Sequence, residues 1–391
     1  LKGITLMGTG DFTHPEWFKE LREKLQRHQN GLYVLEGQPQ NDIPENCRAD
    51  VYFVPSAELS CIYSKAARVR KIHLVVLMPS LEDVAIFNTR LSSIGNLSAD
   101  GRPILGVDAK AVLKIALETN PEALVIPAHA WTPHFSVFGA FSGFDSLEEC
   151  FEELTEYVYA IETGLSSDPP MNWRLSALDR VRLVSNSDAH SPARIGREAN
   201  VFNTELSYRG IYNAIKTGQG LEATVEFFPE EGKYHYDGHR PCGVYLHPKE
   251  TMKHDGRCPV CGGQLTIGVM HRVEALADRP EGYHNPAFKP FYSIVPLQEI
   301  IAEALRVGPN TKKAQEMYFK ALSNLGPEFQ ILMNTPLDEI ERTSGGMVAE
   351  GIRRVREGKV NIRPGYDGVY GEVSLFKEPE VAEIKGQGTL F

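Results

Sequence analysis

The sequence lacks long hydrophobic runs. No segment of the 391 residues approaches the roughly 18 consecutive apolar residues of a membrane-spanning helix. The first residues also lack the regions of a signal peptide. We therefore expect a cytoplasmic protein with no membrane partner. The chain is long enough for two or three domains with cores of their own, and we expect a monomer.

Cysteine is also scarce. Six cysteines in a chain of this length are too few for a disulfide framework. Cys47, Cys61 and Cys150 are isolated in the sequence, and we expect them to be buried thiols. Cys258 and Cys261 are separated by only two residues, a spacing typical of a metal site.

Positive charge is in deficit, because 41 Lys and Arg stand against 51 Asp and Glu and give a net charge of −10. This deficit argues against indiscriminate binding to nucleic acid, since affinity for phosphates grows with cationic contacts. A local basic track can nevertheless be masked by acidic residues elsewhere. Two runs are candidates for such a track, and a solvated face is an equal alternative for each. They are Lys65, Arg68, Arg70 and Lys71, and Arg353, Arg354, Arg356, Lys359 and Arg363.

The organisation of the chain changes twice. From residue 3 to about 204, apolar runs alternate with amphipathic stretches, a pattern that predicts a parallel β-sheet covered by helices and favours a barrel. A segment rich in Gly, Pro, His and Cys follows, and then a helical pattern broken by Gly-Pro pairs. We expect a barrel over 1–227, a small metal-dependent module over 228–285, a helical domain over 286–376 and a flexible tail over 377–391.

Carboxylate and imidazole residues follow several of the apolar runs. The clearest example is Val184 to Ser187, which leads directly into Asp188-Ala189-His190. Mixed oxygen and nitrogen ligands suit Zn, Mn or Fe, and two or three such metals are a common device for phosphoester hydrolysis. Taken singly, His73 could be a hydrogen-bonded histidine of the core and Asp11 could cap the following helix. Together, these residues favour a metal cluster. The candidate ligands are Asp11, His14, Glu58, His73, His129, Asp188 and His190.

A second metal site is predicted near residue 250. His239 and Cys242 form an H-x2-C pair, and Cys258 and Cys261 form a C-x2-C pair followed by glycine. Two-residue spacers let a tight turn direct both ligands at one tetrahedral Zn²⁺ ion. His247 and His254 remain alternatives to His239 as the fourth ligand. A redox-active C-x-x-C pair is disfavoured because the sequence lacks a thioredoxin-like strand and helix around it.

The sequence resembles a known superfamily over residues 1 to 227. Its segments Gly8-Thr9-Gly10-Asp11, Ala57-Glu58, Ile72-His73-Leu74, Ala128-His129-Ala130 and Ser187-Asp188-Ala189-His190 are similar to motifs of the polymerase and histidinol phosphatase (PHP) superfamily of phosphoesterases. The segments 10–15 and 162–169 and the 230–280 module resemble endonuclease Q within it. The resemblance implies a distorted seven-stranded β/α barrel with a trinuclear metal site.

The resemblance also implies a function. We expect a metal-dependent DNA repair endonuclease that cleaves the phosphodiester 5′ to deaminated bases such as uracil or hypoxanthine, with Glu58, Asp188 and His190 as catalytic residues. The expected cofactors are one structural Zn²⁺ ion and two or three divalent ions of Zn, Mn, Fe or Mg. A small-molecule phosphatase on the same barrel and a non-catalytic DNA-binding scaffold are alternatives.

The sequence departs from the superfamily pattern at two places. Members open with a strand that ends in a metal-binding His-x-His pair, and the given sequence begins at Leu1 without one. We therefore expect an incomplete metal site. Phe12 also stands where many relatives have a histidine ligand.

Several residues are candidates for contact with DNA. Trp131 and Phe135 belong to an aromatic loop that could form the wall of a pocket for an extruded base, although a loop folded over the barrel rim is an equal alternative. The candidates for contact with phosphates or bases are Arg68, Trp131, Phe135, Ser166, Ser167 and Arg197. Aromatic and cationic residues around the small module suit base stacking, or packing on its neighbours.

The last five residues form a further motif. Gln387, Leu390 and Phe391 resemble the peptide by which bacterial repair and replication proteins dock on the sliding clamp. Glutamine supplies hydrogen bonds and the Leu-Phe pair fills an apolar pocket, a combination typical of short anchoring peptides. We therefore expect a bacterial sliding clamp as a possible partner.

Overall fold

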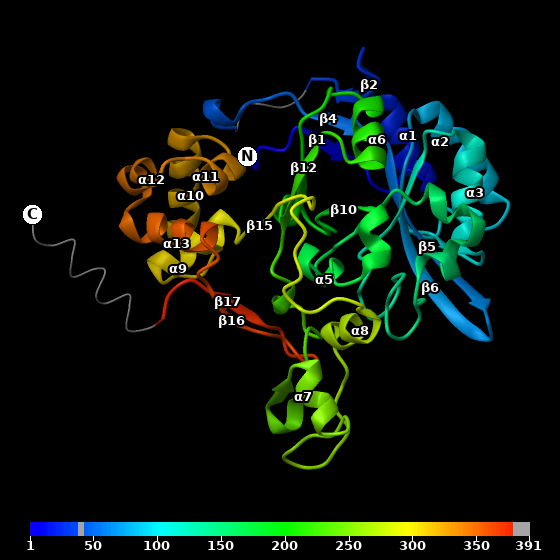
Figure 1. The fold of residues 1–391 in the computed structure, drawn as a ribbon. Helices are drawn as coiled ribbons and strands as arrows, with labels where there is room; N and C mark the ends of the chain where they lie inside the picture. Colours follow the sequence, from blue (N-terminus) through cyan, green and yellow to red (C-terminus); the bar gives the residue numbers. More distant parts are fainter. Residues whose placement is uncertain (38–42, 378–391) are drawn as a thin grey trace, which may run out of the picture.

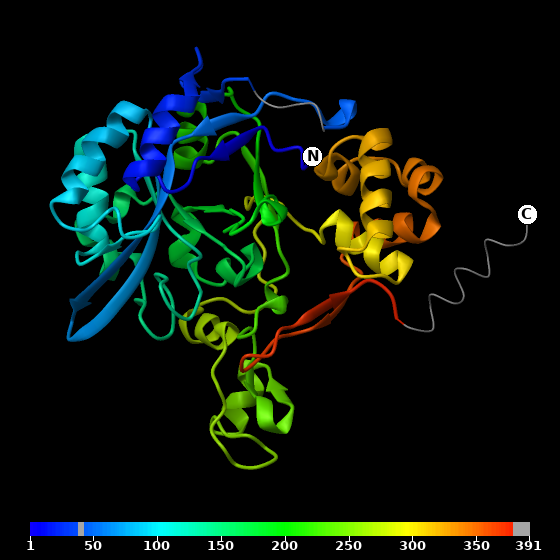
Figure 2. The same cartoon turned by 180° about the vertical axis from the view of Figure 1, so that it is seen from behind.

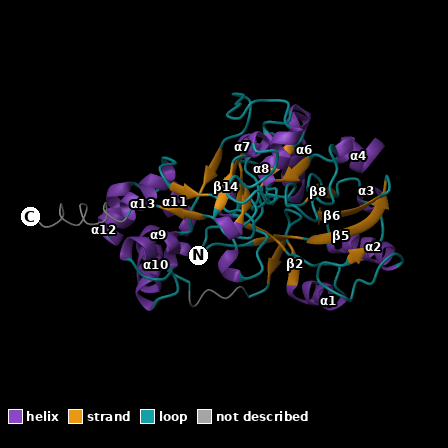
Figure 3. Cartoon of the chain, turned by 90° about the horizontal axis from the view of Figure 1, so that it is seen from below, coloured by secondary structure: helices purple, strands orange, loops and turns teal. Residues whose placement is uncertain are grey.

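The computed structural model describes residues 1–37 and 43–377, and the chain has a mixed α/β fold. An α/β body carries a helical domain on one side and a small module below it (Figure 1). Seen from below, the helices of that domain gather at the end opposite strands β5 and β6 (Figure 3). Within the described ranges, no helix combines the length and apolar character needed to cross a membrane.

Two four-stranded sheets form much of the body. The first has the order β1 (Leu6–Gly8), β4 (Tyr52–Val54), β3 (Tyr33–Leu35) and β2 (Leu25–Arg27). The second has the order β7 (Ile104–Leu105), β5 (Ser56–Lys65), β6 (Arg68–Leu77) and β8 (Leu124–Pro127). Smaller ladders join β9 (Ala160–Glu162) to β10 (Arg182–Val184), and β11 (Ala199–Phe202) to β12 (Leu221–Glu226) and β15 (Phe291–Ser293).

The expected parallel sheet is wrong for the longest strands of the body. β5 and β6 form an antiparallel hairpin, and β6 also pairs antiparallel with β8. The hairpin turns at Ala66 and Ala67, which both have positive φ angles, as a type I′ hairpin turn requires. Neither residue is glycine or asparagine, so the usual sequence signal for such a turn is absent. In the described residues the ladders remain separate sheets and do not close into one hydrogen-bonded barrel.

Helices cover the sheets because each has one apolar face. α2 buries Leu81, Val84, Phe87 and Leu91 against the core, and the Ser80 side chain caps its first turn. The helices of the body are α1 (Pro15–Lys24), α2 (Leu81–Ser92), α3 (Ala109–Thr119), α4 (Leu147–Phe151), α5 (Pro169–Asn172) and α6 (Tyr208–Thr217).

The small module is joined closely to the body. It contains β13 (Asp237–His239), β14 (Val244–Leu246), α7 (Pro248–Lys253) and α8 (Val269–Leu276). Val269, Met270 and Val273 of α8 belong to the main hydrophobic core of the body. The small module and the body therefore share one core across the predicted boundary between residues 227 and 228.

The helical domain has its own hydrophobic core, to which Val225 and Phe228 of the body also belong. Its helices are α9 (Leu297–Leu305), α10 (Lys312–Leu325), α11 (Glu328–Met333), α12 (Leu337–Ser344) and α13 (Gly346–Arg356). A hairpin of β16 (Asn361–Arg363) and β17 (Glu372–Ser374) then runs from this domain to the small module, as Figure 2 shows from behind. The start of the chain lies beside α11, where the Glu328 backbone N–H donates to the Leu1 carbonyl at 2.9 Å.

Candidate functional site

The β5–β6 hairpin places Glu58 and His73 on one face of the second sheet. Glu58 pairs with Val75 and Ser60 with His73, so Glu58 and His73 are diagonal neighbours across the ladder. His129 follows β8, the next strand of the same sheet. One ligand atom from each of Glu58, His73 and His129 lies within 4.8 Å of the other two. One carboxylate and two imidazoles at this separation form a candidate metal centre.

Direct hydrogen bonds join the three side chains. Glu58 Oε1 lies 2.8 Å from His73 Nδ1 and 3.3 Å from His129 Nε2, and the two imidazole nitrogens are 3.1 Å apart. Burial raises the pKa of Glu58, but the hydrogen bonds from His129 and His73 outweigh it and hold the pKa well below its usual range. Burial lowers the pKa of His73. The carboxylate is therefore ionised, the form that binds a metal ion.

Three loops beside this centre contain strained residues. Asp11, His129 and Asp188 have φ angles of 47°, 30° and 43°, a region that non-glycine residues rarely adopt. They follow β1, β8 and β10 respectively. Such strain persists only where surrounding structure holds it, and it is frequent at functional sites.

The other predicted ligands lie outside the tight group. Asp11, His14, Asp188 and His190 are not among the side chains that converge within 4.8 Å. The side chain of His190 is 75% exposed, and its Nδ1 atom lies 3.8 Å from Asp188 Oδ1. Phe12 is a core residue, fully buried against Phe87. Glu58 and His73 do not follow strands but lie within β5 and β6.

Two residues of this region were not predicted. Arg102 Nη1 donates to Glu58 Oε1 at 3.2 Å, so a cation lies beside the candidate centre. Glu162 is buried and accepts hydrogen bonds from the His129 backbone N–H at 2.6 Å and from Asn186 Nδ2 at 2.8 Å. Burial raises the pKa of Glu162 to about 7. Glu162 ends an apolar strand, so the pattern of an acidic residue after an apolar run, which identified Asp188, could also have identified Glu162. The sequence around Arg102 has no such pattern.

The residues predicted to contact DNA have different environments. Trp131 is 1% exposed and donates to Asn172 Oδ1, so it packs in the core and does not form the wall of a surface pocket. Ser167 is fully buried, and its hydroxyl is satisfied by the Thr163 carbonyl and by Asn172 Nδ2. Ser166 and Phe135 are partly exposed, and Arg68 is exposed near the tip of the β5–β6 hairpin.

Arg197 holds the backbone of the Asp188 loop. Its Nε donates to the Ser187 carbonyl at 2.8 Å, and its Nη2 donates to the Asp188 carbonyl at 3.0 Å. Burial lowers the pKa of Arg197. These bonds give the side chain a structural role in this loop, while its predicted contact with phosphate stays a prediction.

Most cations of the predicted basic tracks have internal partners. Arg70 is buried over the Phe144 ring, and Lys65 pairs with Glu152 at 2.5 Å. Arg353 pairs with Glu350, and Arg356 donates to three backbone carbonyls near α11. Neither run is therefore a continuous row of free cations.

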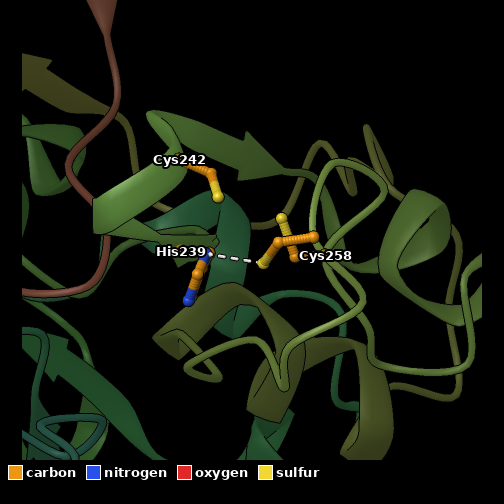
Figure 4. A group of neighbouring side chains, drawn as sticks. His239, Cys242 and Cys258 are labelled. Atoms are coloured by element: carbon orange, nitrogen blue, oxygen red, sulfur yellow. Dashed lines mark hydrogen bonds between the residues drawn. The ribbon is translucent and has the colours of Figure 1, made fainter.

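The predicted zinc ligands lie together in the small module. His239, Cys242, Cys258 and Cys261 each bring a ligand atom within 4.8 Å of the others, and Figure 4 shows three of them turned toward one another. Burial raises the pKa of Cys258, but backbone N–H groups of Cys261 and Val260 outweigh it and lower the pKa to about 7, which favours the thiolate form. His247 is outside the group and accepts from the Lys249 backbone N–H, so His239 is the histidine that fits.

Comparison with known proteins places the chain in a family. Residues 296–359 match the family model described as the MJ0043 C-terminal domain. The chain is 33% identical over 271 residues to uncharacterized protein MJ0043 of Methanocaldococcus jannaschii, a match over 67% of this chain that spans about a third (33%) of that relative. It is 30% identical over 385 residues to uncharacterized protein YqxK of Bacillus subtilis, covering 95% of this chain and 89% of YqxK. The chain belongs to the YqxK family.

Solved structures of endonuclease Q share the fold of this YqxK family member. The lesion-specific endonuclease PfuEndoQ from Pyrococcus furiosus has a TM-score of 0.83 and 29% identity, and the match covers 100% of this chain and 92% of PfuEndoQ. Endonuclease Q in complex with a 27-mer duplex that has an abasic lesion at the active site has a TM-score of 0.80 and 29% identity, over 97% of this chain and 90% of that one.

Proposed function

We propose that this protein is a DNA repair endonuclease that hydrolyses the phosphodiester 5′ to a deaminated base such as uracil or hypoxanthine. One observation carries this proposal: the whole chain superimposes on a lesion-specific endonuclease. The likeness to endonuclease Q bound to a duplex with an abasic lesion supports DNA as the substrate.

The residues of the candidate centre fit divalent metal ions. An ionised carboxylate and two imidazoles converge at Glu58, His73 and His129, and this donor set suits Zn, Mn or Fe. We propose that Asp11, His14, Asp188 and His190 supply further ligands from the neighbouring loops. When bound, the metal ions would neutralise the phosphate and make water nucleophilic near neutral pH. In this proposal Glu58, Asp188 and His190 are the catalytic residues.

Other residues of the chain supply positive charge beside the candidate centre and hold its loops in place. Arg102 donates to Glu58 and is 37% exposed, so its guanidinium is available to a phosphate near the centre. Arg197 holds the left-handed backbone at Asp188. Gly101 allows the Asp11 carboxylate to approach closely, because a Cβ atom there would lie 2.6 Å from Asp11 Oδ2.

The aromatic loop offers an exposed stacking surface. His134 and Phe141 are exposed and stacked, with ring centroids 4.6 Å apart. The loop also contacts the candidate centre, since the Phe135 ring lies 4.7 Å from the His73 ring. Stacking on a base needs such an exposed ring. We therefore propose His134 and Phe141, in place of Trp131, as the base-stacking residues of this loop.

An incision assay tests the proposed function. The protein is incubated with end-labelled duplexes that contain one uracil, one hypoxanthine, one abasic site or no lesion, with Mn²⁺, Mg²⁺, Zn²⁺ or a chelator. We expect metal-dependent cleavage on the 5′ side of the lesion that leaves a 3′-hydroxyl group. Hydrolysis of p-nitrophenyl phosphate without incision would instead identify a phosphatase, and binding without incision would identify a scaffold.

A partner is proposed from the sequence of the tail. Gln387, Leu390 and Phe391 lie outside the described residues. Their resemblance to clamp-docking peptides supports binding to a bacterial sliding clamp, which would bring the enzyme to replicating DNA.

A further inference from the structure

A loop far along the chain lies against the cysteine and histidine group. Residues 364–371 join β16 to β17 and reach the small module, where the hairpin meets β13 (Figures 1 and 2). The Tyr236 backbone N–H donates to the Gly365 carbonyl at 2.9 Å, and the Gly368 N–H donates to the Lys233 carbonyl at 2.9 Å. A Cβ atom at Gly365 would lie 2.3 Å from the Gly232 carbonyl oxygen, so this approach requires glycine.

Asp367 in this loop bonds to both segments that carry the metal ligands. Its Oδ2 accepts from the Arg240 backbone N–H at 2.6 Å, and Arg240 lies between His239 and Cys242. Its Oδ1 accepts from Thr266 Oγ1 at 2.6 Å. Thr266 follows the Cys258–Cys261 pair and is hydrogen-bonded to Gly238 through both backbone groups. One carboxylate therefore ties the two ligand pairs together.

The neighbouring Tyr366 packs on the same strand. A Cβ atom at Gly238 would lie 2.4 Å from the Tyr366 ring, so this ring covers the position directly before His239. The Tyr366 ring also lies 5.2 Å from the ring of Tyr245 on β14. The loop therefore supports both strands of the β13–β14 ladder, and it does so from more than 100 residues away in the sequence.

We propose that Asp367 is a positioning residue for the Cys3His site, so that zinc binding by the small module depends on the hairpin of the C-terminal region. Groups that orient metal ligands through hydrogen bonds typically contribute about 10- to 100-fold to metal affinity. Asp367 orients the ligands of this site through the backbone of Arg240 and the side chain of Thr266. The inference rests on the proposed zinc site and is independent of the nuclease activity. In this proposal the metal-dependent module predicted over 228–285 also needs the C-terminal hairpin to hold its metal ligands in place.

The test measures zinc affinity of the full chain by competition with a chromogenic chelator. We expect Asp367→Ala to weaken zinc binding about 10- to 100-fold, and Thr266→Val, which removes one of the two bonds, to weaken it less. Glu372→Ala is the matched control, because Glu372 lies on the same hairpin, is exposed and, within the described residues, forms its salt bridge with exposed Arg363. This control should retain the affinity of the unaltered protein.

Two further measurements separate the possible outcomes. Co²⁺ absorption spectra report the ligand geometry directly, and Asp367→Ala should shift the thiolate bands while Glu372→Ala should not. If Asp367→Ala does not fold, the zinc affinity of Thr266→Val decides whether this hydrogen bond positions the ligands. Zinc affinity equal to that of the unaltered protein in both variants would overturn the positioning role. Equal zinc content in the unaltered protein and in Cys258→Ser would overturn the zinc site itself, and with it this inference, whatever the incision assay gives.

Discussion

Glu58 Oε1 lies 2.8 Å from His73 Nδ1 across the β5–β6 hairpin. The contact depends on the register of the ladder, because a slip of one residue would send the two side chains to opposite faces of the sheet. The Ala66–Ala67 turn fixes that register. A strand pairing, and not closeness in sequence, therefore forms the candidate centre.

Replacing Glu58 by glutamine should abolish metal-dependent incision. The substitution keeps the size of the side chain but removes the charge that a metal ion requires, so we expect a fall of about 100-fold or more in incision rate. Ser60→Ala is the control, since Ser60 pairs directly with His73 and its buried hydroxyl has no hydrogen-bond partner among the described residues. Rates measured on a uracil duplex should separate the two variants. Near-normal incision by Glu58→Gln would refute the assignment of this centre.

Replacing Arg197 by alanine should lower kcat for incision about 10-fold and leave KM for DNA nearly unchanged, because the lost hydrogen bonds hold the Asp188 loop. Arg197→Lys should recover part of the rate. Arg194→Ala, at an exposed position in the same loop, serves as the control. A raised KM with an unchanged kcat would show instead that Arg197 contacts DNA, as the sequence alone predicts.

The stability of the metal-free protein should fall as the pH rises from 4.5 to about 8, in part because of Glu226. Burial raises the pKa of this fully buried carboxyl from 4.5 to about 8. Between these values the folded protein keeps a proton that the unfolded chain releases, so the stabilisation is complete below pH 4.5 and is lost as the pH passes 8. The loss amounts to a few kcal/mol.

Thermal unfolding between pH 5 and pH 9 measures this effect. Glu226→Gln should flatten the dependence of Tm on pH, because an amide does not titrate. Glu222→Gln should leave it unchanged, since Glu222 lies on the same strand but is exposed. Identical slopes for both variants would show that Glu226 does not titrate in this range.

Deleting residues 387–391 should remove binding to a sliding clamp and leave incision of a short oligonucleotide unaffected. Leu390 and Phe391 are expected to be the buried anchors of this contact. The measurement is a competition assay with a fluorescent peptide of the terminal sequence bound to the purified bacterial clamp. We expect the intact protein to displace this peptide. Equal displacement by a Leu390→Ala, Phe391→Ala variant would contradict it.

The sequence by itself determined the ligand types of both candidate sites and the short-range geometry of the cysteine and histidine site. The two-residue spacing in His239 to Cys242 and Cys258 to Cys261 fixes how a turn presents each pair, and the structure brings the four side chains together. The mixed α/β character also follows from local patterns of apolar residues, and the solved relatives share this fold. Such features depend on neighbours along the chain, so they can be recognised without a fold.

Only the tertiary structure decided which residues meet across long separations. The pairing of β5 with β6, the burial of Trp131 and the inward bonds of Arg197 all depend on register and packing, which no local spacing encodes. Asp367 is the clearest case, because it contacts Arg240 across 127 positions and belongs to no recognisable metal motif. Hydrogen bonds of this kind form only when separate elements have packed against each other, so their geometry follows from the fold and not from the order of the residues.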